Sequence, residues 1–92
     1  MTGTAHLDPS RRFEIACRIA GALAEFGRTR LTLRRPDQQT TCDARSTDLP
    51  ALLSEGFIEL ACDGLRIRFT QDSIQWDAQS DGLARQIAAA FD

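Results

Sequence analysis

The chain has 92 residues, of which 42% are hydrophobic and 26% charged, and its formal net charge at pH 7 is -2. This length predicts one small domain over residues 1–92, and the composition is that of a globular protein, not of a disordered one. Neither a basic leader with an apolar run nor 18 consecutive apolar residues occurs, which disfavours secretion and membrane spanning, so we expect a cytoplasmic protein.

The first predicted helix follows a segment, residues 1–7, that we expect to be flexible. Asp8 can cap the helix, and Pro9 is tolerated in its first turn, while Gly27 ends it after Phe26. One face of this helix is apolar and should face the core. It comprises Ile15, Ile19, Ala22, Leu23 and Phe26.

A second apolar stripe lies beside that face. Its members are Phe13, Cys17, Ala20 and Ala24. Small side chains allow another helix or strand to approach closely. We therefore interpret the stripe either as additional core or as the seam of a homodimer.

The segment after Gly27 changes to the period of a strand, with Leu31 and Leu33 on one face. Pro36 and Asp37 predict a turn, and residues 39–44 predict a weaker strand near an edge. A short helix should then begin at Thr47 or Asp48 and end at Gly56. Its inward residues are predicted to be Leu49, Leu52 and Leu53.

Residues 57–78 predict two consecutive hairpins. A tight turn at Asp63 and Gly64 pairs only apolar residues on one face: Cys62 with Leu65, Leu60 with Ile67 and Ile58 with Phe69. A second turn at Gln71 and Asp72 extends this apolar face, pairing Phe69 with Ile74 and Ile67 with Trp76. The other face then brings Glu59 beside Arg68 and Arg66 beside Asp77.

A last helix is predicted from a cap at Ser80 or Asp81 to about Phe91. The expected order is helix, two strands, short helix, three-stranded meander, helix. We therefore predict an α+β fold with a mostly antiparallel sheet and helices packed on one face.

The sequence gives little support for a metal site or a cofactor site. The one histidine and three cysteines, His6, Cys17, Cys42 and Cys62, lack the spacing of a zinc site, and we expect the cysteines to be buried free thiols. The six glycines are dispersed and form no phosphate-binding loop. We predict no metal, no cofactor and no catalytic residue; the sequence does not identify a small-molecule ligand.

Positive charge is concentrated early in the chain. Residues 11–35 hold seven arginines against two acids, whereas residues 36–92 hold four arginines against ten acids. The candidate patch for an anion or an acidic partner is Arg28, Arg30, Arg34 and Arg35. Ion pairing within the molecule, for instance of Arg30 with Asp43, is the alternative use of these arginines. The acidic pI and the lack of interleaved aromatics disfavour nucleic acid.

The segment His6-Leu7-Asp8-Pro9, followed by a hairpin that ends in Asp43-Ala44-Arg45-Ser46, resembles the phosphocarrier proteins of sugar phosphotransferase systems. The resemblance implies that His6 would carry a phosphoryl group and that Ser46 would be regulatory. Asp8 stands where that family has an arginine, and we expect no room for a strand before the histidine. A phosphocarrier-like or other small enzyme centred on His6 is therefore the alternative function.

The size, acidity and order of elements are also similar to those of bacterial secretion chaperones, which are dimers that bind an extended client. The function that we predict first is a non-catalytic interaction or regulatory module that binds a partner protein or its own copy. The bipolar charge and the second apolar stripe favour it. A secretion-chaperone-like client binder is a further alternative.

Overall fold

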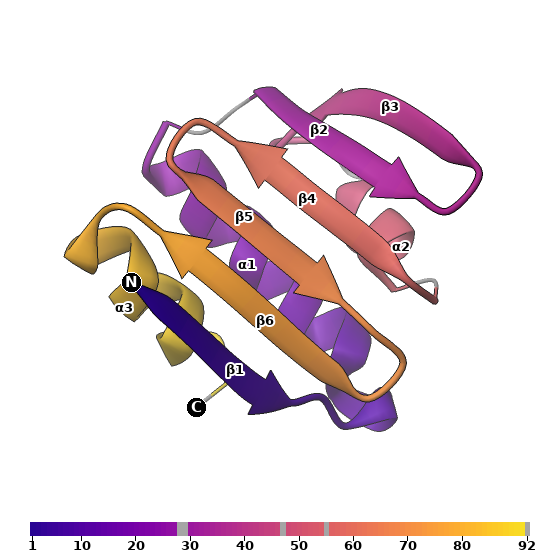
Figure 1. Ribbon diagram of the computed structural model, residues 1–92, viewed down its shortest axis with the longest axis horizontal. Coiled ribbons are helices and arrows are strands. Elements are labelled where there is room, and N and C mark those ends of the chain that lie inside the picture. Colours follow the sequence, from indigo (N-terminus) through magenta and orange to yellow (C-terminus); the bar gives the residue numbers. More distant parts are fainter. Residues whose placement is uncertain (28–29, 47, 55, 92) are drawn as a thin grey trace.

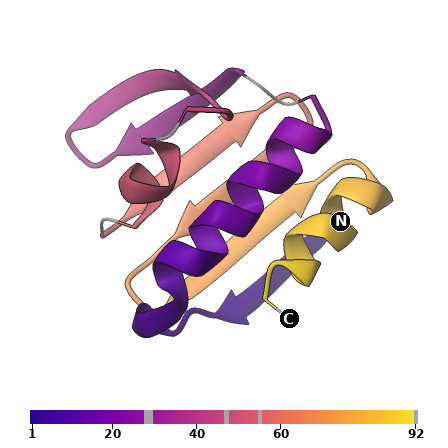
Figure 2. The same ribbon diagram turned by 180° about the vertical axis from the view of Figure 1, so that it is seen from behind.

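A computed structural model describes residues 1–27, 30–46, 48–54 and 56–91. One antiparallel sheet of six strands is covered on one face by the described helices (Figures 1 and 2). This arrangement confirms the predicted α+β class. The elements are β1 (Thr2–His6), the 3-10 turn η1 (Pro9–Arg11), α1 (Arg12–Glu25), β2 (Arg30–Arg35), β3 (Gln38–Asp43), α2 (Leu49–Leu53), β4 (Ile58–Cys62), β5 (Leu65–Phe69), β6 (Ser73–Ala78) and α3 (Asp81–Ala89).

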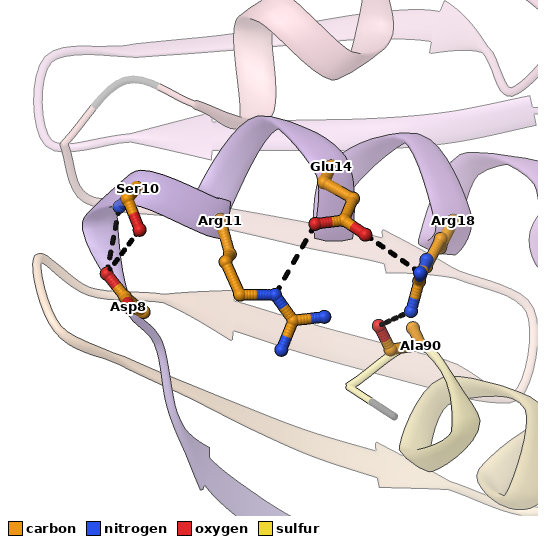
Figure 3. Close-up of polar contacts among 6 residues, drawn as sticks. All are labelled: Asp8, Ser10, Arg11, Glu14, Arg18 and Ala90. Carbon is orange, nitrogen blue, oxygen red and sulfur yellow. Dashed lines mark hydrogen bonds and ion pairs between the residues drawn. The ribbon is translucent and has the colours of Figure 1, made fainter.

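Asp8 forms the predicted cap, but it caps a 3-10 turn that precedes α1. The Asp8 carboxylate accepts hydrogen bonds from both the backbone N–H and the hydroxyl of Ser10, at 3.0 and 2.9 Å (Figure 3). Pro9 to Arg11 form a 3-10 turn before α1 begins. Gly27 follows the helix with φ at +74°, a left-handed backbone conformation that glycine adopts readily. This conformation ends the helical hydrogen bonding.

The exposed side of α1 carries an ion-pair network (Figure 3). The Glu14 carboxylate lies 3.4 Å from Arg11 Nε and 2.8 Å from an Arg18 guanidinium nitrogen. Arg18 also donates to the carbonyl of Ala90 at 3.3 Å, which links α1 to the end of α3. These arginines are therefore engaged within the molecule, as charged helix surfaces usually are.

The two predicted hairpins have the predicted register. Strands β4 and β5 pair Cys62 with Leu65, Leu60 with Ile67 and Ile58 with Phe69. Strands β5 and β6 pair Phe69 with Ile74 and Ile67 with Trp76. Gly64 has φ at +77°, as its place in a tight turn requires. The hairpin of β2 and β3 around Pro36 and Asp37 is confirmed as well.

The predicted flexibility of residues 1–7 is wrong. Residues 2–6 form β1, which pairs antiparallel with β6 and becomes an edge of the sheet. Its inward positions are Gly3 and Ala5, which are too small to give an apolar alternation. The ring of Trp76 on β6 lies against Gly3, so that a Cβ atom on Gly3 would collide with it. Leu7, fully buried, anchors the end of the strand.

The core lies between the helices and the inner face of the sheet. Helix α1 lies over the middle of the sheet, roughly in line with the strands, with α2 and α3 on either side of it (Figure 2). Buried α1 residues include Ile15, Ile19 and Leu23, as predicted. Two shorter helices complete the layer: α2 buries Leu49 and Leu53, and α3, capped by the Ser80 hydroxyl, buries Leu83, Ala84 and Ile87.

One charged residue belongs to this core. Arg12 is 7% exposed, and its guanidinium donates to the carbonyls of Leu53, Gly56 and Thr70. The guanidinium also lies over the ring of Phe69, 5.8 Å from its centroid. Burial lowers the pKa of Arg12 below its usual value. One side chain thereby connects α1 with the segment after α2 and the loop after β5.

Candidate binding surface

The side of the sheet away from the helices is called here the helix-free face, because no described element packs on it (Figures 1 and 2). Strand alternation places buried residues such as Leu33, Leu60 and Ile67 under the helices and their neighbours on the helix-free face. The charged residues on it are Arg30, Arg34, Asp43, Glu59, Arg66, Arg68, Asp77 and the titratable His6.

One row of side chains crosses all six strands of this face. Register places Glu59 between Arg34 on β2 and Arg68 on β5. Polar, uncharged residues extend the row to both edges. The complete row is Gln39, Arg34, Glu59, Arg68, Gln75 and Thr4. The centre of the face therefore combines charge with flanking hydrogen-bonding groups.

Three arginines surround the single carboxylate at this centre. Glu59 lies 3.7 Å from Arg34, 3.8 Å from Arg66 and 3.3 Å from Arg68. We name these three arginines the arginine cluster. The Glu59 side chain is 17% exposed, whereas each arginine side chain is more than half exposed. Three cations share one anion, so this part of the face has an excess of positive charge available to solvent.

The predicted patch of arginines is divided by the fold. Arg30 and Arg34 lie on the helix-free face, but Arg35 lies on the opposite face of β2, and Arg28 is outside the described residues. Arg66 and Arg68, which the predicted patch does not include, share Glu59 with Arg34. The predicted hairpin register already indicates that Arg66 and Arg68 lie on one face of the sheet. Their proximity to Arg34 depends on the pairing of β2 with β4, which the hairpin register does not predict.

The predicted ion pairs hold only in part. Arg68 contacts Glu59 as expected, but Arg66 contacts Glu59 and not its direct neighbour Asp77. Arg30 is directly opposite Asp43, yet that carboxylate contacts Arg45. Hydrogen bonds from Arg45 lower the pKa of Asp43, and the carboxylate in turn raises the pKa of Arg45.

A depression of about 530 Å³ adjoins the arginine cluster on β1, β5 and β6. Its lining includes Arg66 and Arg68 from the cluster together with Thr2, Thr4 and Gln75. Asp77 also lines it, so the depression is cationic toward β5 and acidic at one end of β6.

The second apolar stripe is divided between surface and core. Phe13 is 57% exposed and Cys17 is exposed. Ala20 is buried, and Ala24 is half-buried against the core. The residues that the stripe offers to a partner are therefore those nearest the start of α1.

His6 is exposed on the helix-free face at the end of β1, opposite Ser73. A strand does precede the histidine, contrary to the expectation of no room for one. The pKa of Asp8, two residues further along the chain, falls chiefly through the Ser10 hydrogen bonds and slightly through His6. Ser46 follows β3, at the opposite edge of the sheet. The two residues of the phosphocarrier resemblance are therefore far apart, and a carboxylate adjoins the histidine.

The three cysteines are less buried than the sequence predicts. Cys17 is exposed, while Cys42 and Cys62 are half-buried, and all three are free thiols. Burial, assisted by the charge of Asp43, raises the pKa of Cys42, so its reactive thiolate is disfavoured at neutral pH. Within the described ranges no three His, Cys, Asp or Glu residues gather as a metal site would require.

Comparison of the chain with protein-family models, curated proteins and solved structures gives no match. Among the described helices, none is long and apolar enough to cross a membrane. We therefore base the functional proposal on the charge and geometry of the helix-free face.

Proposed function

We propose that the protein is a non-catalytic binding module that holds a partner protein on the helix-free face of its sheet. The observation that carries this proposal is the arginine cluster around Glu59, at the centre of a face on which no described element packs. Excess charge steers a complementary partner and fixes its orientation. Arginine suits such a surface, since its planar guanidinium makes directed, paired hydrogen bonds.

The supporting scaffold is rigid in the way that recognition requires. Each member of the arginine cluster comes from a strand paired on both sides, so the backbone positions are fixed by the sheet. Binding groups on such a scaffold lose less conformational freedom than groups on a loop. The expected cellular compartment for this function is the cytoplasm.

A second copy of the chain is the alternative partner, and the exposed end of the α1 stripe supports it. Phe13 and Cys17 present apolar surface on the helical side, away from the arginine cluster. An exposed phenylalanine can anchor an interface when a partner buries it. Self-association there would leave the helix-free face open to a different protein.

Photo-crosslinking from defined positions tests the proposal in cells. A benzoylphenylalanine replaces Gln75, which is exposed in the central row of the helix-free face, or Gln86, which is exposed on α3. We expect a discrete crosslinked product from position 75 and not from position 86. Mass spectrometry identifies the captured protein, and calorimetry then measures its binding to the unmodified chain.

The outcomes separate the two kinds of partner. A product of twice the 10.2 kDa chain mass from position 75 identifies the chain's own copy on this face. A captured protein that binds equally well after Arg34→Gln, Arg66→Gln and Arg68→Gln are combined contradicts the assigned role of the cluster. Equal capture from both positions contradicts a specific binding face.

A further inference from the structure

We propose that the helix-free face recognises an extended acidic peptide segment, whose carboxylates pair with the arginine cluster on both sides of Glu59. This inference rests on the proposed function and specifies the chemistry of its partner. The guanidinium groups of Arg34, Arg66 and Arg68 each reach Glu59 with one nitrogen in the ion pairs described above. A guanidinium has several N–H donors, so these side chains, each more than half exposed, have donors beyond those that reach Glu59.

Charge complementarity selects the class of ligand. The cluster offers three positive charges to one internal carboxylate, so further carboxylates are attracted to it. The three arginines more than offset the charge of Glu59, whose side chain is 17% exposed, so the centre of the face keeps a positive excess toward an incoming anion. The internal pair shows the geometry that a ligand carboxylate would take, since Arg68 already donates to Glu59 at 3.3 Å.

The spacing of the sheet fits an extended peptide. Arg34 and Arg68 belong to strands that flank β4, so their backbones lie roughly 10 Å apart at the usual strand spacing. Carboxylates two residues apart on an extended peptide lie on the same side, about 7 Å from one another. Two such carboxylates fall within reach of flexible arginine side chains on opposite sides of Glu59.

The neighbouring depression can hold the rest of the peptide. It adjoins Arg66 and Arg68, and its volume of about 530 Å³ is that of a small-ligand site. Thr4 and Gln75 supply hydroxyl and amide groups for peptide hydrogen bonds. Asp77 lies at its β6 side and disfavours a carboxylate there. A segment that alternates acidic with uncharged polar residues therefore suits this surface.

A nucleic acid fits the same surface less well. A nucleic acid carries a phosphate on every nucleotide, so some phosphates would lie against Glu59 or Asp77. Base stacking requires exposed aromatic side chains, and the exposed large apolar residues of the described chain, Met1, Phe13 and Phe57, all lie outside its strands. A peptide can place its carboxylates so as to avoid both acids.

The test uses a fluorescein-labelled ten-residue peptide of alternating glutamate and serine, and the same peptide with glutamine for glutamate. Fluorescence anisotropy measures binding to the full chain at low and physiological salt. We expect the glutamate peptide to bind, the glutamine peptide not to bind, and the affinity to fall with salt. A labelled single-stranded oligonucleotide is the competing ligand, and tighter binding to it than to the peptide would overturn the proposal.

Variants assign the binding to the arginine cluster. The combined Arg34→Gln, Arg66→Gln and Arg68→Gln variant should lose about tenfold or more in affinity, given three exposed ion pairs. The control Arg85→Gln, to be compared with the single variant Arg68→Gln, removes an exposed arginine of α3 outside the cluster and should leave the affinity unchanged. Circular dichroism verifies that all three proteins fold. Equal losses in the two single variants would show nonspecific charge attraction and overturn the assignment.

Removing the internal carboxylate gives the opposite prediction. Glu59→Gln frees all three guanidinium groups for the ligand, so the glutamate peptide should bind more tightly than it does to the wild type. Weaker binding would show that the arginines depend on Glu59, and would contradict their capture of ligand carboxylates. If no acidic peptide binds but crosslinking from position 75 still captures a partner, the proposed function stands and this inference fails.

Discussion

Arg12 shows how one residue connects parts of the chain that are far apart in sequence. Its acceptors are backbone carbonyls at Leu53, Gly56 and Thr70, which lie 41 to 58 positions away. Nothing in the sequence around Arg12 distinguishes it from its neighbour Arg11, because a carbonyl acceptor has no side-chain signature. The burial of Arg12 could therefore not be predicted from the helical pattern.

Replacement of Arg12 should destabilise the fold strongly. Arg12→Ala leaves three carbonyls without their donor, and we expect a loss of about 3 kcal/mol in the free energy of unfolding. Urea denaturation measures the loss. Arg85→Ala, at an exposed position of α3, should change stability by less than about 0.5 kcal/mol. Similar stability of the two variants would contradict the structural role of Arg12.

Gly3 leaves no room for a side chain beside Trp76. A methyl group at Gly3 would collide with the ring of Trp76, so Gly3→Ala must displace either β1 or the indole. We expect a loss of about 2 kcal/mol, as is usual for overpacking, and faster hydrogen exchange of the β1 amides. Gly82→Ala is the control, since its new methyl would meet Phe26 at an ordinary 3.5 Å. Unchanged exchange in β1 would refute the contact.

Individual elements differ in how much of their structure the sequence reveals. The meander of β4, β5 and β6 was predictable to the residue, because Asp63-Gly64 specifies a tight turn and only one register buries every apolar pair. Strand β1 was not, since its inner positions, Gly3 and Ala5, are small. The apolar contact that secures this strand comes from Trp76, a residue of its partner.

Helix α1 contains an opportunity for stabilisation. Gly21 lies in the middle of the helix, and a methyl group there would meet nothing within 4 Å. Gly21→Ala should therefore raise the free energy of unfolding by about 0.5 to 1 kcal/mol, because glycine loses more backbone entropy in a helix. Thermal denaturation by circular dichroism measures the change. A decrease would indicate that the surface around Gly21 is covered in solution.

The cap at the start of the first helix makes a prediction about pH. Hydrogen bonds from Ser10 lower the pKa of Asp8 below the usual aspartate value of about 3.9, so the capping contribution is present above that pH and disappears as Asp8 is protonated below it. Asp8→Ala should be less stable than wild type at pH 7, and the difference should shrink below about pH 4. Urea denaturation across this range measures it.

A control distinguishes charge from capping. Asp8→Asn keeps a side-chain oxygen that can accept the hydrogen bond from the Ser10 N–H, so it should lose less stability at pH 7 than Asp8→Ala. If the difference between wild type and Asp8→Ala stays constant from pH 7 to pH 2, the ionised carboxylate does not contribute as described.

At the scale of the whole molecule, the candidate binding surface was only partly predictable. Clustering of arginines in the sequence identified Arg30 and Arg34 but also included Arg35, which faces the other way. The arginine cluster depends on the sheet order, in which β2 lies between its hairpin partner β3 and β4. Local patterns determine hairpins, whereas the packing of distant segments determines which hairpins become neighbours.

The exposed end of the α1 stripe makes a prediction about the oligomeric state. If the chain's own copy binds through the α1 stripe, light scattering should show an average mass that rises above 10.2 kDa with concentration, and Phe13→Asp should suppress the rise. Phe57→Asp is a matched control, since Phe57 is 60% exposed against 57% for Phe13. Equal self-association after Phe13→Asp excludes the stripe as a seam, and a constant monomer mass directs attention to a different protein.

The pairing of β1 with β6 joins residues roughly 70 positions apart in sequence. During synthesis β1 leaves the ribosome before its partner exists, and at 5–20 residues per second it waits roughly 4 to 14 s. Helix α1 and the hairpins can form in that interval from contacts closer in sequence. The strand made first is therefore among the last to join the sheet, and the newborn chain must keep an unpaired strand from premature association until β6 emerges.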